Sequence, residues 1–203
     1  MLRYAITNRA LFPGDESAKQ ADVLRHAFHW VRDGFDFIQL REKDLSGDAL
    51  AALASEILET ISATTRPTRL LVNSRADVAV ATRAHGVHLS AAPDAVTPDE
   101  VRGLYASAKL PAPIVSVSCH TLFEVERARA NLADLILFAP VFEKSLGSGQ
   151  NLQGQGPDRL REACATALPI PVLALGGVTF QNAAVCLAAG AAGIAGIRLF
   201  HGG

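Results

Sequence analysis

The stretch PIPVLALGGVTFQNAAVCLAAGAAGIAGI, Pro169–Ile197, decides the fold. Its first part, Pro171–Gly177, is apolar at nearly every position and ends in two glycines. Thr179–Ala189 then has the composition of a helix closed by Gly190, and a second apolar run begins at Gly193. A strand that is apolar on both faces is typical of a parallel sheet covered by helices. The stretch therefore predicts two parallel strands joined by a helix.

The same alternation extends over the rest of the chain. Apolar runs predict eight strands, at Leu2–Thr7, Phe35–Glu42, Arg69–Asn73, Gly86–Ser90, Ile114–His120, Leu135–Pro140, Pro171–Gly177 and Gly193–Phe200. Segments with helical spacing of apolar residues predict seven helices, at Ser17–Asp33, Asp48–Ala63, Asp77–Ala84, Pro98–Ala106, Leu122–Asn131, Pro157–Ala167 and Thr179–Ala189. Eight regular units in 203 residues favour a closed (β/α)8 barrel, the TIM barrel, over an open doubly wound sheet.

We therefore predict an α/β protein with a single TIM-barrel domain over residues 1–203. The chain stops three residues after Phe200, so we expect the eighth helix to be short or absent. After the sixth strand, a segment rich in Gly, Ser and Gln runs from Glu143 to Gly156, and we expect it to be a loop.

Composition narrows the class of partner. The formal net charge is −1 and charges of both signs are interspersed, which argues against nucleic acid or a membrane surface as the main partner. No apolar run reaches about 18 residues and the start MLRYAIT lacks the features of a signal peptide, so we expect a cytoplasmic protein without a membrane span. The three cysteines are widely spaced, which predicts reduced thiols and no zinc site.

In a TIM barrel the active site lies at the carboxyl ends of the strands. Polar residues at the ends of the second to fifth strands are Gln39, Arg41, Glu42, Lys43, Asn73, Arg75, His88, Ser90, Ser118 and His120. His120 could exchange a proton near pH 7, or it could be only a hydrogen-bonded residue before a helix. His88 lies between apolar neighbours and is better explained as a structural residue. Glu42 could be a second acid–base group or simply the partner of Arg41.

Gly176 and Gly177 indicate a phosphate site, because a backbone without Cβ atoms can approach an anion closely. We expect a helix starting near Thr179 to add its positive end. Phosphate sites of TIM barrels recur after strands seven and eight, which adds candidates from the eighth strand. These candidates are Gly196, Ile197 and Arg198. A glycine pair can also serve only a turn, and Arg198 can be part of a surface ion pair.

Taken together, these residues resemble the thiamine-phosphate synthase family. The matching motifs occur in order and are IQLREK (Ile38–Lys43), LVNSRADVAV (Leu71–Val80), GVHLS (Gly86–Ser90), VSCHTLFE (Val117–Glu124), DLILFAPVFE (Asp134–Glu143) and PIPVLALGGVTFQNAAVCLAAGAAGIAGI (Pro169–Ile197). The resemblance implies a TIM barrel, a role in making thiamine phosphate, and a homodimer. Synthases of this family join an aminopyrimidine pyrophosphate to a thiazole phosphate with Mg²⁺, which implies a small phosphorylated pyrimidine or thiazole as ligand.

The chain departs from the family at the metal. Synthases carry one Asp after the Asn of strand three and another just after strand four, whereas this chain has Ser74 and Ala91–Ala92–Pro93 there. Asp94 is out of register by one or two residues, and the Thr-rich loop after strand six is replaced by Glu143-Lys144-Ser145-Leu146-Gly147-Ser148. Without a cation, a departing pyrophosphate would keep several uncompensated charges in a partly dry site. We therefore predict no resident metal.

The pattern more closely resembles the TenI-type branch, which keeps the barrel, the phosphate site and the histidine of strand five but lacks the metal aspartates. Its activity is thiazole tautomerisation, an isomerase reaction that aromatises a thiazole carboxylate phosphate by moving a proton. We predict a metal-independent thiazole tautomerase without cofactor, with His120 as the acid–base residue. The expected substrate contacts are Gln39, Arg41, Lys43, Asn73 and Ser118, the expected phosphate contacts are Gly176, Gly177, Gly196, Ile197 and Arg198, and the expected loop contacts are Glu143 and Lys144.

Two alternatives stay open. One is a divergent thiamine-phosphate synthase, a transferase in which Asp94 or Glu143 would recruit Mg²⁺. The other is a non-catalytic regulator that binds a phosphorylated ligand.

Overall fold

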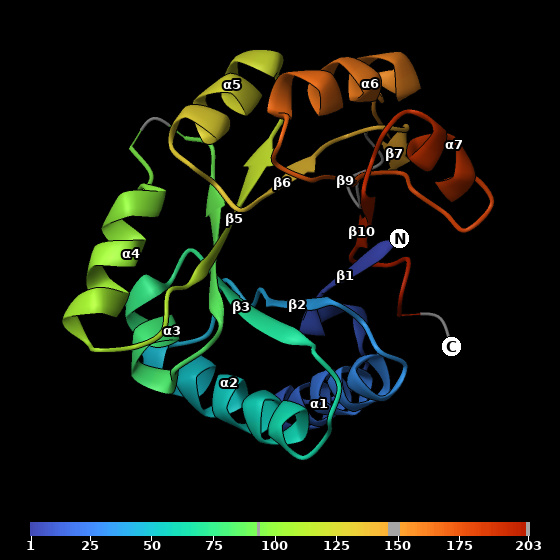
Figure 1. The fold of residues 1–203 in the computed structure, drawn as a ribbon. Coiled ribbons are helices and arrows are strands. Elements are labelled where there is room, and N and C mark those ends of the chain that lie inside the picture. Colours follow the sequence, from blue (N-terminus) through green and yellow to red (C-terminus); the bar gives the residue numbers. More distant parts are fainter. Residues whose placement is uncertain (93, 146–150, 202–203) are drawn as a thin grey trace.

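The computed structural model of the protein describes residues 1–92, 94–145 and 151–201, in which strands and helices alternate (Figure 1). In chain order the elements are β1 (Leu2–Ile6), the 3-10 turn η1 (Arg9–Leu11), α1 (Glu16–Arg32), β2 (Phe37–Leu40), α2 (Gly47–Ser62), β3 (Arg69–Asn73), α3 (Ala76–Thr82), β4 (Gly86–Ser90), α4 (Pro98–Ser107), β5 (Ile114–Cys119), α5 (Leu122–Ala130), β6 (Leu135–Phe138), β7 (Lys144–Ser145), β8 (Asn151–Leu152), α6 (Gly156–Ala167), β9 (Val172–Ala174), α7 (Ala183–Ala188) and β10 (Gly193–Gly196). Of the residues named above, Pro93, Leu146, Gly147 and Ser148 lie outside the described residues, as do the side chains of Lys144 and Ser145.

Eight of the described strands close into one parallel barrel, in the order β1-β10-β9-β6-β5-β4-β3-β2. The seam is made by β1, which pairs with β10 on one side and with β2 on the other. The helices surround this barrel on its outside (Figure 1). The prediction of an α/β TIM barrel is therefore confirmed.

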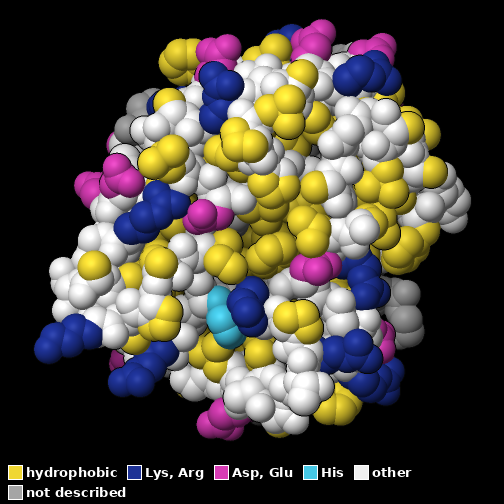
Figure 2. Space-filling model, in the orientation of Figure 1, with side chains coloured by type: hydrophobic (Ala, Val, Ile, Leu, Met, Phe, Trp, Pro, Cys, Tyr) yellow, Lys and Arg dark blue, Asp and Glu magenta, His cyan; other side chains and the backbone are white. Residues whose placement is uncertain are grey.

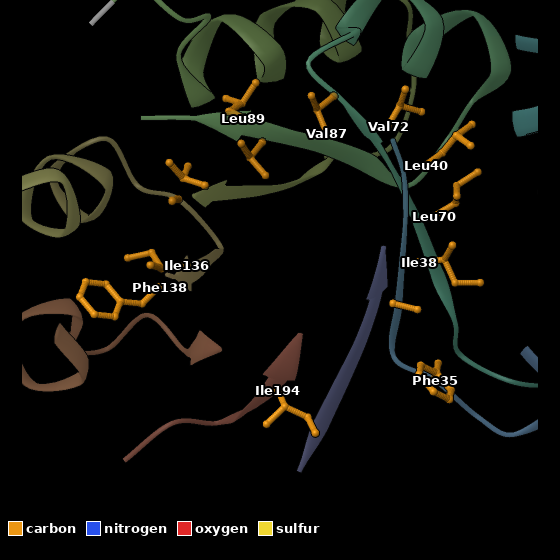
Figure 3. Close-up of a cluster of buried hydrophobic side chains, with 14 of the residues drawn as sticks. Phe35, Ile38, Leu40, Leu70, Val72, Val87, Leu89, Ile136, Phe138 and Ile194 are labelled. Carbon is orange, nitrogen blue, oxygen red and sulfur yellow. The ribbon is translucent and has the colours of Figure 1, made fainter. Parts of the chain in front are cut away.

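The barrel separates two apolar layers. The larger layer lies between the outer faces of the strands and the helices, and contains Ile38, Leu70, Val87, Phe138 and Ile194 (Figure 3). A second cluster consists of alternate strand residues, among them Tyr4, Ile6, Leu71, Leu137 and Leu173. Successive side chains of a strand point to opposite faces, so this second cluster fills the barrel interior. Strands buried on both faces explain the near-continuous apolar runs of the sequence.

Three predicted strands are too long, because the structure ends them at Phe37–Leu40, Val172–Ala174 and Gly193–Gly196. Two other predictions are wrong about the element itself. The helix expected at Thr179–Ala189 begins only at Ala183, because Thr179 and Asn182 first close a turn in which each side chain accepts a hydrogen bond from the other's backbone N–H. The segment expected as a loop from Glu143 to Gly156 contains the antiparallel pair β7 and β8.

The described residues after β10 form a turn and no helix, as expected. This turn packs on the end of α1 and on the segment between α1 and β2. Trp30 of α1 donates a hydrogen bond from Nε1 to the carbonyl oxygen of Phe200, 3.1 Å away. The Phe200 ring also packs edge-on against Phe35, with centroids 4.8 Å apart. These contacts hold the described residues after β10 against α1 and the segment that leads into β2.

The distribution of charged side chains on the surface agrees with the interspersed charges of the sequence. On the face shown in Figure 2, acidic and basic side chains are interspersed and apolar side chains gather near the barrel axis. No helix within the described part of the chain is long and apolar enough to cross a membrane.

Candidate active site

Two adjoining cavities open among the residues at the carboxyl ends of the barrel strands. The first, here called the His120 cavity, has a volume of about 350 Å³ and is lined by Gln39, Arg41, Lys43, Asn73, Ser74, His88, Ser90, Ser118 and His120. The second, the Gly177 cavity, has about 510 Å³ and is lined by Asn8, Arg41, Glu143, Gly176, Gly177, Thr179, Gly196, Ile197 and Arg198. Arg41, Leu175, Gly176 and Ile197 belong to both linings, so the two cavities meet there.

The structure brings together His120 and the residues predicted to contact substrate or phosphate, and Glu143 of the predicted loop contacts, whereas the strand-end candidates Glu42 and Arg75 line neither cavity. Those expected to contact substrate surround the His120 cavity, and those expected to contact phosphate surround the Gly177 cavity. Their roles remain predictions. Lys144 belongs to β7, and its side chain lies outside the described part of the chain.

His120 lies between the end of β5 and the start of α5 and is held on two sides. Its backbone N–H donates to the Glu124 carboxylate, which also takes part in the capping box that Thr121 makes at the start of α5. Its ring atom Nδ1 lies 2.7 Å from the carbonyl oxygen of Ala139. A carbonyl oxygen only accepts hydrogen bonds, so Nδ1 carries the proton. In the neutral ring the free lone pair is then on Nε2, as a general base requires.

Gln39 and Asn73 form a short polar chain at the ends of β2 and β3. Gln39 is almost fully buried and donates from Nε2 to Asn73 Oδ1, 3.0 Å away, and Asn73 donates to the Ser74 hydroxyl. The Gln39 Oε1 atom is buried and has no hydrogen-bond partner within the described residues. Arg41 is half-buried at the junction of the two cavities, where its backbone N–H donates to Thr7 Oγ1.

Glu42 is not the partner of Arg41, which corrects one of the two predicted roles. It is buried and accepts hydrogen bonds from the backbone N–H and from Nη1 of Arg9, a residue that sequence reasoning missed. Glu42 also lines neither of the two cavities, and the contacts described for it are those of a buried ion pair with Arg9. Arg9 further pairs with Asp44 and Glu16, and these carboxylates, Asp44 above all, raise the pKa of its guanidinium. Arg9 and Glu42 are 33 positions apart, so no local signal could have joined them.

His88 lies in the wall of the His120 cavity and is buried, which agrees with its structural interpretation. Its Nε2 atom is 2.8 Å from the hydroxyl of Ser118, and its Nδ1 atom is 2.8 Å from the hydroxyl of Ser116. Burial, with a smaller contribution from the Arg41 charge, lowers the pKa of His88 to about 3. The ring is therefore neutral at physiological pH.

The Gly177 cavity owes its shape to two glycines with left-handed backbone. Gly176 has φ +87° and Gly177 has φ +64°, and a Cβ atom on Gly177 would lie 2.5 Å from the carbonyl oxygen of Glu143. Only glycine fits there without strain. Within the described residues, the backbone N–H groups of Gly177, Val178 and Arg198 have no hydrogen-bond acceptor. Free N–H groups around a concave backbone are typical of anion sites.

The sequence predicted two further features of this candidate anion site. The predicted help from a helix beginning near Thr179 is wrong, because α7 begins at Ala183 and the Thr179 N–H already donates to Asn182. The alternative that Arg198 belongs to a surface ion pair is not observed: its exposed side chain has no carboxylate partner in the described part of the chain and lines the cavity. Arg198 and Arg41 are thus the cations among the described residues that line this cavity.

The described residues do not match the donor set that Mg²⁺ prefers. The lining of the His120 cavity contains hydroxyl and amide oxygens but no carboxylate, and Glu143 is the only carboxylate described in the Gly177 cavity. Asp94 lines neither cavity. No group of three or more His, Cys, Asp or Glu side chains within the described residues could hold a metal ion. Mg²⁺ is usually bound by one or two carboxylates together with substrate phosphates, so the described lining offers no more than one of its usual protein ligands.

Comparison with known proteins gives the same family along the whole chain. A family model described as thiamine monophosphate synthase matches residues 3–200. The thiamine-phosphate synthase of Chlorobium luteolum is 34% identical over 181 residues, which cover 89% of this chain and 79% of that protein. The thiamine-phosphate synthase of Caldanaerobacter subterraneus subsp. tengcongensis is 32% identical over 202 residues, or 98% and 86% of the two chains. Among solved structures, the thiamine phosphate pyrophosphorylase from Pyrococcus furiosus has a TM-score of 0.79 at 25% identity, covering 100% of this chain and 88% of that one.

Proposed function

The chain belongs to the thiamine-phosphate synthase family, and on that premise we propose that it is a metal-independent thiazole tautomerase. Its substrate would be a thiazole that carries a carboxylate and a phosphate. The enzyme would move one proton from one position of the ring system to another, so that the ring becomes aromatic. The bond to hydrogen at the first position breaks and one at the second position forms, while the double bonds between them shift into the aromatic ring. No atom is gained or lost, and no redox partner is needed.

The observation that supports this proposal best is the fixed ring of His120. Its Nδ1–H donates to the Ala139 carbonyl, which leaves the Nε2 lone pair for the substrate. Nε2 of His120 can remove the proton from the substrate and return it at the second position, because the imidazole ring of His120 holds that proton between the two steps. Neutral side chains and the cations Arg41 and Lys43 share the cavity with it, and both cations would attract an anionic ring.

The adjoining Gly177 cavity would hold the substrate phosphate. Its free backbone N–H groups and Arg198 supply donors and positive charge on one side, and Arg41 stands at the junction with the His120 cavity. A phosphate held there would place the ring of the same molecule toward His120. Binding energy from a non-reacting group would thus position the reacting one.

The synthase alternative requires the departure of pyrophosphate, which needs more neutralising charge. Glu143 offers the one carboxylate among the described lining residues, so a magnesium ion there would depend mainly on substrate phosphates and water for its ligands. This donor set favours the tautomerase over the synthase. The names of the curated relatives favour the synthase, and so it stays as the second candidate.

Two further features belong to this proposal. We expect the enzyme to act as a homodimer, as family members commonly do. We also expect it in the cytoplasm, since the three cysteines are free and a reducing compartment keeps them so.

Two assays on the purified protein separate the candidates. In the first, the non-aromatic thiazole carboxylate phosphate is converted in the presence of EDTA, and the aromatic product is followed by its absorbance. In the second, aminopyrimidine pyrophosphate and thiazole phosphate are supplied with Mg²⁺, and released pyrophosphate is measured. We expect turnover in the first assay only. Turnover in the second assay alone would establish the synthase, and tight substrate binding without turnover in either would establish a binding protein.

A further inference from the structure

A chain of four polar side chains crosses the barrel interior and ends at the His120 cavity. Tyr4 of β1 has its hydroxyl 3.1 Å from the hydroxyl of Ser116, which in turn lies 2.8 Å from Nδ1 of His88. On the other side of the ring, Nε2 of His88 lies 2.8 Å from the hydroxyl of Ser118. Tyr4, Ser116 and His88 are buried, whereas Ser118 is half-buried and lines the cavity.

The neutral His88 ring has one donor nitrogen and one acceptor nitrogen, so the chain can run in only two directions. In one direction, Tyr4 donates to Ser116, Ser116 donates to Nδ1, and the Nε2–H donates to Ser118. Every buried O–H and N–H then has an acceptor. The Ser118 O–H is the only donor left over, and it lies at the cavity.

The opposite direction leaves a buried group unpaired. If Nδ1 carried the proton, it would donate to Ser116, and Ser116 would donate to Tyr4. The Tyr4 hydroxyl is within hydrogen-bonding distance only of Ser116 and of Nδ1 of His88 among the described residues, so its own proton would have no acceptor. Tyr4 is fully buried, and an unpaired buried donor disfavours this direction by roughly ten- to a hundred-fold.

We propose that Tyr4 and Ser116 fix the Nε2–H tautomer of His88, and that this fixed chain presents the Ser118 hydroxyl to the substrate as a hydrogen-bond donor. Tyr4, Ser116 and His88 are then positioning residues, because they act through Ser118. The substrate atom that faces Ser118 must be an acceptor. On the proposed function, on which this assignment of the ligand rests, that acceptor is an oxygen of the thiazole carboxylate.

The tautomer can be measured on the ligand-free protein, whatever reaction it catalyses. Nitrogen-15 NMR of protein labelled in its histidines distinguishes a protonated ring nitrogen from an unprotonated one, and His88→Gln identifies the His88 signals. We expect a protonated Nε2 and an unprotonated Nδ1 at neutral pH. A protonated Nδ1, or an equal mixture of the two tautomers, would overturn the proposal.

Variants test which residues set the direction. In Ser116→Ala, Tyr4 remains within 3.5 Å of Nδ1 and can still donate to it, and in Tyr4→Phe the Ser116 hydroxyl still donates to it. We therefore expect each single variant to keep the Nε2–H tautomer and the double variant to lose the preference. An unchanged tautomer in a folded double variant would show that the chain does not set it.

The donor role of Ser118 is tested by binding. The probes are the thiazole carboxylate phosphate and the thiazole phosphate that lacks the carboxylate. We expect Ser118→Ala to weaken the first by about 10- to 100-fold, the range for one hydrogen bond to a charged group, and to leave the second nearly unchanged. Equal effects on both probes would refute the carboxylate contact. An inactive protein with the expected tautomer would refute only the proposed reaction.

Discussion

Replacing His120 by Ala separates a catalytic role from a structural one, because the structure predicts very different effects on rate and on stability. The side chain is exposed, and its only hydrogen bond among the described residues goes to the carbonyl oxygen of Ala139. That oxygen keeps a second donor, Gln155 Nε2, at 3.1 Å. The free energy of unfolding should therefore fall by no more than about 1 kcal/mol. Loss of the proposed acid–base group should reduce kcat by about 10²- to 10⁴-fold.

Both quantities can be measured on the same preparation. Tautomerase turnover in EDTA gives kcat and KM, and urea denaturation gives the free energy of unfolding. His29→Ala is the matched control, since that half-buried ring on α1 lies away from both cavities and should leave kcat unchanged. The assignment of His120 as the base would be refuted by a kcat within about threefold of the parent protein. A loss of stability of several kcal/mol would show that the geometric account of its contacts is wrong.

Three further predictions follow from the site and its support. The folded state keeps His88 neutral down to about pH 3, whereas the same side chain in the unfolded chain binds a proton below about pH 6.5. The free energy of unfolding should therefore be unaffected by this group above pH 6.5 and fall by up to about 1.4 kcal/mol per pH unit on acidification below it. Urea denaturation measured across this pH range should show a smaller dependence on pH in His88→Gln than in the parent protein. Gly177→Ala places a Cβ atom 2.5 Å from a carbonyl oxygen at a residue with φ +64°, and it should weaken the binding of thiazole phosphate at least about tenfold, as measured by calorimetry. Gly103→Ala is the control, because no atom lies within 4 Å of the added Cβ, and it should leave the affinity unchanged. Arg9→Met leaves the buried Glu42 carboxylate without its cation and should lower the free energy of unfolding by about 3–5 kcal/mol, and a loss below 1 kcal/mol would contradict the described pairing.

The barrel could be predicted because its strands are buried on both faces and its helices on one. Arg69–Asn73 and Gly86–Ser90 begin and end where the sequence predicted, since an apolar run and a buried strand coincide there. The start of α7 could not be placed in the same way. Ala-rich composition extends the helical pattern back to Thr179, but the turn that Thr179 makes with Asn182 depends on side-chain hydrogen bonds that a hydrophobic pattern does not contain.

The candidate site was predictable to the extent that it follows from strand order. Once eight parallel strands close, the residues at their carboxyl ends must converge, and so Gln39, Asn73, Ser118 and His120 share one cavity. What strand order does not contain is the partner of each side chain. The pairing of Arg9 with Glu42 depends on how two loops meet in space.

The two histidines of the His120 cavity show how the hydrogen-bond partner of a side chain decides what that side chain can do. The same side chain can be a base or a donor, and the choice depends on which ring nitrogen carries the proton. At His120 a carbonyl oxygen fixes the proton on Nδ1 and frees Nε2 to accept. At His88 the proposed hydroxyl chain would fix it on Nε2, so that Ser118 donates. An acceptor and a donor would then face the same cavity before any ligand binds, which is the arrangement needed to hold a carboxylate while a proton moves on the ring beside it.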